Sequence, residues 1–214
     1  MITLAVFLFI QILYPIYILV LLLGIILVKI SRNKDAKIGV VGPQKAGKTL
    51  FLNALNGIWG TKPEQTIQFE KYETIEYRFD DGTTRTFKNC KDVPGSNSFI
   101  RTTYTEILED STDLLFFFNM KQYLENPDYE RDVNARLDYI YEVRKSINKD
   151  DKSLPVTLIL SYADQVKNVR KAFLAIQDKL SKKDYGKMCQ NHMYPINMEK
   201  EDEVKKLIEK LFKK

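Results

Sequence analysis

The sequence predicts a three-layer α/β domain, with a mostly parallel six-stranded sheet and one antiparallel edge strand, preceded by one transmembrane helix. Three observations indicate this: an uncharged apolar run, a glycine-rich loop placed between a strand and a helix pattern, and apolar runs that then alternate with helical patterns. The 214 residues suit one ordinary domain with an appendage. We expect an anchor over residues 1–30, a short basic linker over 31–35 and the domain over 36–214.

The first element is the apolar run at residues 2–28, which is long enough for the roughly 20 residues that a membrane-spanning helix needs. Pro15 is compatible with such a helix, because a kink is tolerated inside a membrane. A cleavable signal peptide would have a basic start and a shorter apolar core. We therefore expect a retained single-pass anchor; the alternatives are an uncleaved signal sequence and a buried core helix.

Charge decides the expected orientation. None of the 33 Lys and Arg or 28 Asp and Glu residues precedes Lys29, and Arg32, Lys34 and Lys37 follow it closely. Basic flanks stay in the cytoplasm, so the N-terminus should lie outside the cytoplasm and the domain inside it. The linker would hold the domain near the bilayer, since the seven residues 29–35 span at most about 25 Å.

Composition excludes several other classes of function. The formal net charge of +5 suits a surface of anionic lipid, but it is too diffuse for nucleic acid, and we expect no direct nucleic-acid partner. Cys90 and Cys189 form no CxxC pair, and the single His192 cannot complete a zinc site with them. We expect two buried or half-buried thiols in a reducing compartment.

A phosphate-binding loop follows the predicted strand of residues 36–42. The string GPQKAGKT, residues 42–49, matches GxxxxGK[ST], and the apolar, helix-forming residues 50–57 come next. The two glycines let the backbone curl, so that successive N–H groups and the helix N-terminus surround phosphate oxygens. Lys48 would reach the β and γ phosphates and the Thr49 hydroxyl would ligate Mg²⁺. The expected nucleotide contacts are Gly42, Gln44, Lys45, Ala46, Gly47, Lys48, Thr49 and Leu50.

A hairpin and a second phosphate motif come next. TIEYRF and TRTFKN flank the turn at Asp81 and Gly82, which predicts two antiparallel strands. The string DVPG at residues 92–95 fits DxxG and begins 43 residues after Thr49. Asp92 would bind Mg²⁺ through water, and the Gly95 N–H would contact the γ phosphate.

With these motifs the chain resembles the small GTPases of the Ras superfamily, which share a P-loop NTPase fold. Within them it is most similar to the Arf group and to the β subunit of the signal-recognition-particle receptor, which also has an N-terminal anchor. The resemblance covers residues 36–214 and implies GTP or GDP with Mg²⁺ as cofactors. It identifies Thr66 as the switch I threonine on Mg²⁺ and the γ phosphate; Thr61 competes for this role, and a surface threonine is the alternative.

The base-reading motif of this family, [NT]KxD, has a partial match. After the predicted strand within residues 154–165 come Ser161, Tyr162, Ala163 and Asp164. By resemblance Asp164 accepts the N1 and N2 hydrogens of guanine, while Tyr162 replaces the lysine that packs on the base and offers a stacking surface. The alternative for Asp164 is an N-cap of the following helix. Asn197, in MYPINM, is the candidate from the closing motif.

The resemblance also bears on hydrolysis. The residue after Gly95 is Ser96, followed by Asn97, and neither replaces the glutamine that orients water in many small GTPases. We expect slow intrinsic hydrolysis and assign no catalytic residue. Arg101 is a candidate arginine finger, with a surface arginine as the alternative.

The remaining segments complete the sheet and its cover. Residues 111–120 predict a buried strand and 127–147 a long surface helix. The tail 201–214 has one apolar face, which favours packing on the sheet over lying on a membrane. The resemblance implies a nucleotide-dependent docking switch at the endoplasmic reticulum membrane, with a cytoplasmic partner such as a receptor α-type subunit. The alternatives are a non-cycling scaffold and a P-loop ATPase.

Overall fold

The computed structural model describes residues 17–23, 36–60, 70–92, 100–147 and 156–213. Contacts between residues divide the chain into a large unit, 36–213, and a second unit made of the preceding residues with Lys214.

In the second unit, residues 17–23 are helical and their large apolar side chains are exposed. The other parts of the predicted anchor, 1–16 and 24–30, and the linker 31–35 lie outside the described residues. Within the ranges that the structure does describe, no helix combines the length and apolar character needed to cross a membrane. The anchor therefore stays a prediction.

The large unit is built on a six-stranded sheet, as predicted. Its strand order is β2-β3-β1-β4-β5-β6, and every neighbouring pair is parallel except β2 and β3, which are antiparallel at one edge. The strands are β1 (Ala36–Val41), β2 (Glu70–Arg78), β3 (Thr84–Asp92), β4 (Asp113–Asn119), β5 (Val156–Ser161) and β6 (Met193–Pro195).

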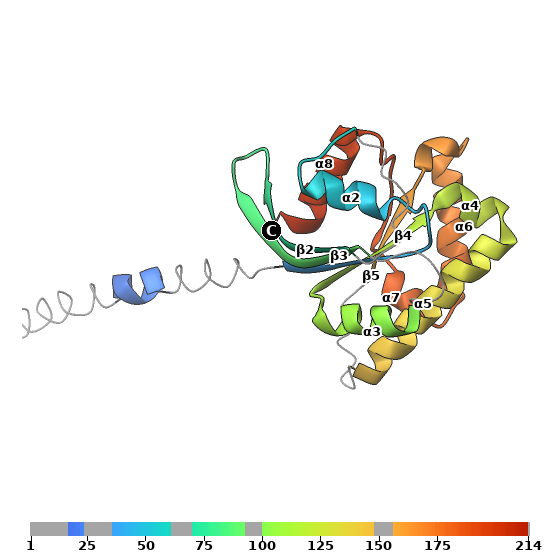
Figure 1. Ribbon diagram of the computed structural model, residues 1–214, viewed down its shortest axis with the longest axis horizontal. Helices are drawn as coiled ribbons and strands as arrows, with labels where there is room; N and C mark the ends of the chain where they lie inside the picture. Colours follow the sequence, from blue (N-terminus) through green and yellow to red (C-terminus); the bar gives the residue numbers. More distant parts are fainter. Residues whose placement is uncertain (1–16, 24–35, 61–69, 93–99, 148–155, 214) are drawn as a thin grey trace, which may run out of the picture. The chain divides into compact units, whose positions relative to one another are not determined.

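Helices cover both faces of this sheet (Figure 1). On one face lie α2 (Lys48–Leu55) and α8 (Glu201–Phe212); on the other lie α3 (Ile100–Asp110), α5 (Pro127–Ile147), α6 (Val169–Ser181) and α7 (Gly186–Cys189). The short helix α4 (Met120–Glu125) joins β4 to α5.

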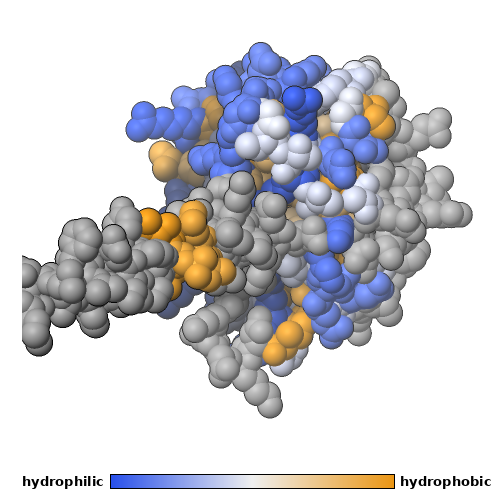
Figure 2. Space-filling model, turned by 90° about the vertical axis from the view of Figure 1, so that its left-hand side faces the viewer, coloured by the Kyte–Doolittle hydropathy of each residue, from blue (hydrophilic) through white to orange (hydrophobic). Residues whose placement is uncertain are grey.

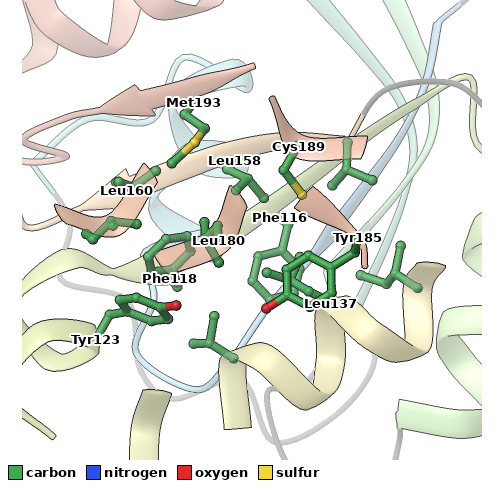
Figure 3. Close-up of a cluster of buried hydrophobic side chains, with 14 of the residues drawn as sticks. Phe116, Phe118, Tyr123, Leu137, Leu158, Leu160, Leu180, Tyr185, Cys189 and Met193 are labelled. Carbon is green, nitrogen blue, oxygen red and sulfur yellow. The ribbon is translucent and has the colours of Figure 1, made fainter. Parts of the chain in front are cut away.

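Two hydrophobic cores result, one on each face, because neighbouring residues of a strand point to opposite sides. In β4, Phe116 and Phe118 enter the core under α5, whereas Leu115 and Phe117 enter the core under α2 and α8. Figure 3 shows the first of these cores, where the two phenylalanines meet Leu158 and other side chains from α5, α6, α7 and β6. This double burial explains why β4 is an almost continuous apolar run.

The β2–β3 hairpin has the predicted turn. The Phe79 N–H donates to the Thr83 carbonyl at 2.8 Å, and the Asp81 carboxylate accepts from the Thr83 N–H at 3.0 Å. Gly82 has a φ of 82°, which a glycine adopts without strain. The turn chemistry of the sequence therefore sets the register of this edge.

Several segment predictions can now be compared with the structure. Helix α5 has the predicted bounds, and α8 buries Val204, Ile208 and Phe212 in the core, so it packs on the sheet. The strand predicted to reach residue 120 ends one residue earlier, because Asn119 caps α4 by accepting from the Gln122 N–H. Both cysteines are buried and free, as expected. Figure 2 shows one face of the molecule, on which hydrophilic residues predominate over the described surface of the domain.

Candidate nucleotide-binding site

The phosphate-binding loop lies where β1 ends and α2 begins. Because β1 is a central strand, the loop sits at the carboxyl edge of the sheet beside the ends of β4 and β5. In open α/β sheets this edge is where ligands bind. Residues 42–47 of the predicted motif form the connection, and its last two residues, Lys48 and Thr49, begin α2.

The backbone of this loop requires its glycines. Gly42 has a φ of 140°, Lys45 of 56° and Gly47 of 88°. A Cβ atom on Gly42 would lie 2.0 Å from the carbonyl oxygen of Phe117 in β4, so no other residue fits there without a shift of the main chain. The loop is thus packed tightly against the strand next to it.

Lys48 closes the loop from inside. Its Nζ donates to the Gly42 carbonyl at 3.0 Å and to the Pro43 carbonyl at 2.7 Å, and the residue is only 6% exposed. A cation held in a concave turn of backbone is suited to bind an anion. Thr49 follows it in the first turn of α2 and is half-buried.

The other predicted contacts of the loop differ in exposure. Ala46 is buried in the core, Leu50 is half-buried, and Gln44 and Lys45 are exposed. The loop therefore offers mainly its backbone and the Lys48 ammonium to a phosphate.

The predicted base-reading segment lies next to the same loop. A Cβ placed on Gly47 would be 3.6 Å from the Cβ of Ser161 and 3.3 Å from the Cγ of Met198. Ser161 ends β5 and Met198 follows β6, and the Ala163 N–H donates to the Ile196 carbonyl at 3.2 Å to join the two segments. The fold thus brings three separate predicted motifs to one place.

Asp164 is exposed in the short 3₁₀-helix η2 (Ala163–Gln165), where its carboxylate is accessible to a ligand. The alternative that it caps the following helix is wrong. Helix α6 begins at Val169, and its N-cap is Asn168, whose Oδ1 accepts from the Lys171 N–H at 2.9 Å. Asp164 lies four positions before this cap, so its carboxylate does not cap the helix.

The neighbours of Asp164 depart from the family pattern. Ser161 is fully buried and its Oγ donates to the Phe118 carbonyl at 3.1 Å, which links β5 to β4. Tyr162 is half-buried with a φ of 58°, and its pKa is raised, first by burial and then by the nearby charges of Glu199 and Asp164. An aromatic ring therefore lies at this rim in place of an amine.

Asn197 is engaged within its own turn. Its N–H donates to the Glu203 carboxylate at 3.1 Å, and its Oδ1 accepts from the Glu199 N–H at 2.9 Å. These two hydrogen bonds stabilise the turn after β6, and the one to Glu199 occupies the Asn197 Oδ1.

The structure describes only some of the residues predicted to bind Mg²⁺ and the γ phosphate. The backbone of Asp92 ends β3 opposite Val40, two residues before the loop, which places it at the correct edge of the sheet. Threonine and aspartate are residue types whose oxygen atoms suit Mg²⁺, so the roles expected of Thr49 and Asp92 stay predictions. Across the described ranges there is no group of three or more His, Cys, Asp or Glu that would bind a metal. Outside those ranges lie Thr61, Thr66, Gly95, Ser96, Asn97 and the side chain of Arg101.

Sequence reasoning missed two residues behind the loop. The Tyr104 hydroxyl in α3 accepts from the Gly42 N–H at 3.1 Å and from Arg136 Nη1 in α5, also at 3.1 Å. Both residues are 1% exposed. Tyr104 lies three residues before the buried Ile107, so in sequence it resembles an ordinary core aromatic, and only the position of its hydroxyl shows more.

No family model and no curated protein sequence matches this chain. Solved structures do. The SelB elongation factor of Methanococcus maripaludis, in complex with a GTP analogue, superposes with a TM-score of 0.53 at 17% identity over 82% of this chain and 33% of SelB. The Arl6 (BBS3) small GTPase of Trypanosoma brucei, with a bound nucleotide analogue, gives 0.58 at 13% identity over 83% of this chain and 95% of its own.

A bacterial selenocysteine-specific elongation factor, EF-Sec, gives a TM-score of 0.54 at 16% identity over 84% of this chain and 28% of its own. The chain thus spans about a third or less of the two elongation factors and nearly the whole length of the small GTPase. The strand order, the loop and these superpositions agree, and the chain has the fold of the small GTPases.

Proposed function

We propose that the chain is a GTP-binding protein that acts as a nucleotide-dependent docking switch. The observation that supports this best is the convergence of the Lys48 loop, the Asp164 segment and the turn after β6 at one edge of the sheet. The phosphates would lie on the loop with the Lys48 ammonium, and the base would lie between the two segments beside Gly47.

The phosphate half is tested by the variant Lys48→Ala. Each contact of a buried ammonium with a phosphate contributes about 1.5–3 kcal/mol, so we expect affinity for GTP to fall by at least about 100-fold. Lys187→Ala is the matched control, because it removes an exposed lysine of α7, which carries none of the predicted nucleotide contacts. Unchanged affinity in Lys48→Ala, measured with a fluorescent GTP analogue, would overturn the proposal.

The base half is tested by Asp164→Asn. A carboxylate accepts the two adjacent N–H groups of guanine, whereas xanthine has a carbonyl in place of the 2-amino group and needs a donor there. We expect Asp164→Asn to lose affinity for GTP by about 100-fold, because it removes two charge-assisted hydrogen bonds, and to gain affinity for XTP, because the asparagine amide can donate to the xanthine carbonyl. Equal loss for both nucleotides would assign Asp164 a different role.

The finer role in this proposal is a docking platform. GTP and Mg²⁺ would order the segments around Thr66 and residues 92–95, and the ordered surface would bind a cytoplasmic partner such as a receptor α-type subunit. Slow intrinsic hydrolysis fits such a platform, because Ser96 follows Gly95 where a glutamine would orient water. Single-turnover hydrolysis that speeds up after Ser96→Gln would support this.

The proposal also places the domain on a membrane, at the endoplasmic reticulum by resemblance. Support comes from residues 2–28, which contain no charged side chain and are followed by a basic flank. We expect the full chain to stay in the membrane pellet after alkaline carbonate washing, and a chain that lacks residues 1–28 to leave it. Release of the full chain would contradict the anchor.

One observation favours the scaffold alternative, in which nucleotide is structural or absent. The usual asparagine and lysine of the base site are replaced by Ser161 and Tyr162, and the Ser161 hydroxyl is bound to the Phe118 carbonyl. A protein whose bound nucleotide does not exchange over hours would support this alternative over a cycling switch.

A further inference from the structure

A buried polar chain runs behind the phosphate loop and joins two helices to it. The Asp132 carboxylate accepts from Arg136 Nε through both oxygens at 3.0 Å, Arg136 Nη1 donates to the Tyr104 hydroxyl, and that hydroxyl accepts from the Gly42 N–H. Asp132 and Arg136 belong to α5, and Tyr104 belongs to α3.

Because this hydrogen-bond network is buried, losing one of its hydrogen bonds is costly. Tyr104 and Arg136 are 1% exposed, so water cannot replace a partner that is removed. Burial lowers the pKa of Arg136, but its contacts with Tyr104 and Asp132 outweigh this and the net shift is upward. The guanidinium therefore stays charged and directs its donors at the tyrosine oxygen.

This hydrogen-bond network ends at Gly42, a backbone position with little freedom to move. Gly42 has a φ of 140°, and a side chain at this position would collide with the Phe117 carbonyl. The same residue accepts from Lys48 through its carbonyl at 3.0 Å. Gly42 is therefore bound through both of its backbone polar groups. Its N–H donates to Tyr104, and its carbonyl accepts from the lysine of the phosphate site.

Tyr104 lies in the helix that follows the DVPG string in the sequence. Helix α3 begins at Ile100, five residues after Gly95 of the DVPG string. The hydrogen bond that the Gly42 N–H donates to Tyr104 therefore links the phosphate loop to the helix that follows this motif in the sequence.

We propose that Tyr104, oriented by Arg136, is a positioning residue that couples the docking of α3 to the shape of the phosphate loop and so to the retention of nucleotide. The inference rests on the proposed function. With α3 docked, the Gly42 N–H is satisfied and the loop keeps the curve that surrounds phosphate. When α3 moves away, the N–H loses its partner and the loop releases its ligand faster.

Two other buried tyrosines show what a purely structural role looks like. The hydroxyls of Tyr123 and Tyr185 both donate to Asn134 Oδ1, at 3.0 and 2.8 Å, within the helical layer on the same face of the sheet. Both side chains are 1% exposed or less. Their hydroxyls stabilise the core and touch no residue of the loop.

The test compares Tyr104→Phe with Tyr123→Phe in the full chain. Each variant removes one buried hydroxyl and keeps the ring. Tyr104→Phe should lower the melting temperature more, because it leaves the Gly42 N–H and Arg136 Nη1 without this acceptor, whereas Asn134 Oδ1 keeps Tyr185 as a donor after Tyr123→Phe. Only Tyr104→Phe should speed the dissociation of a fluorescent GDP analogue, by about tenfold, which corresponds to one lost buried hydrogen bond. It should also speed amide hydrogen exchange in peptides that contain residues 42–49.

The inference is overturned if both variants show the same dissociation rate and the same exchange over residues 42–49. If the wild-type chain binds no guanine nucleotide, the proposed function fails. The exchange measurement then still decides whether Tyr104 holds the loop, since faster exchange only in Tyr104→Phe supports the link and equal exchange refutes it.

Discussion

The substitution Gly42→Ala probes the packing of the phosphate loop directly. Its Cβ would lie 2.0 Å from the Phe117 carbonyl oxygen, whereas real Cβ contacts essentially never fall below 3.0 Å, so the loop or β4 must move by about 1 Å. Overpacking costs about 1–3 kcal/mol and the positive φ about 1–3 kcal/mol more. We take the sum as about 4 kcal/mol.

For a domain of this size each kcal/mol lowers the melting temperature by about 2–4 °C, so Gly42→Ala should lower it by about 8–16 °C. Gly57→Ala is the matched control, because Gly57 has a φ of 74° but nothing within 4 Å of the added atom. Its cost should be about 1 kcal/mol, or 2–4 °C. The assay is thermal unfolding of the full chain in mild detergent, followed by far-ultraviolet circular dichroism. Equal effects of the two substitutions would refute the tight packing of the loop.

Two further predictions concern buried ionisable groups. Burial raises the pKa of the Cys189 thiol to about 12, against an opposing effect of Arg144, so the folded state holds this proton longer than the unfolded state does. The contribution of this thiol to the free energy of unfolding is therefore fully present below pH 9. It is lost as the pH rises from 9 to 12, by up to about 1.4 kcal/mol per pH unit. Cys189→Ala should reduce the difference in free energy of unfolding between pH 8 and pH 10, measured by urea titration. Burial also lowers the pKa of Arg144 to about 10, and its buried Nη1 has no hydrogen-bond partner among the described residues. Arg144→Met should leave the free energy of unfolding unchanged or raise it by about 1–2 kcal/mol; a clear loss of stability would show that the guanidinium has a partner.

The fold could be predicted because its signals are local. The apolar run of β4 and the helix pattern of 127–147 each specify an element without reference to the rest of the chain. The turn at Asp81 and Gly82 similarly fixes the hairpin. Helix α4 was missed because its six residues follow β4 directly, and only the cap at Asn119 separates the two.

The site could be predicted in part. The spacing of the two glycines and the lysine in residues 42–49 predicts a tight backbone turn. The structure has that turn, with the Lys48 ammonium bound inside it. Asp164 was ambiguous in sequence, because an aspartate before a helix can be either a cap or a ligand, and the position of Asn168 removed the first reading. Tyr104 and Arg136 could not be found, since their role depends on a contact between residues 62 positions apart along the chain, Gly42 and Tyr104, which only the fold creates.

The central claim is that the edge of the sheet around Lys48 and Asp164 binds guanine nucleotide. It is tested most directly by titrating the full chain with a fluorescent GTP analogue in the presence of Mg²⁺, and competing it with GTP, GDP and ATP. The account predicts that GTP and GDP displace the probe and that ATP does not, because the Asp164 carboxylate needs the two adjacent donors of guanine. Equal competition by ATP, or no binding at all, would contradict it.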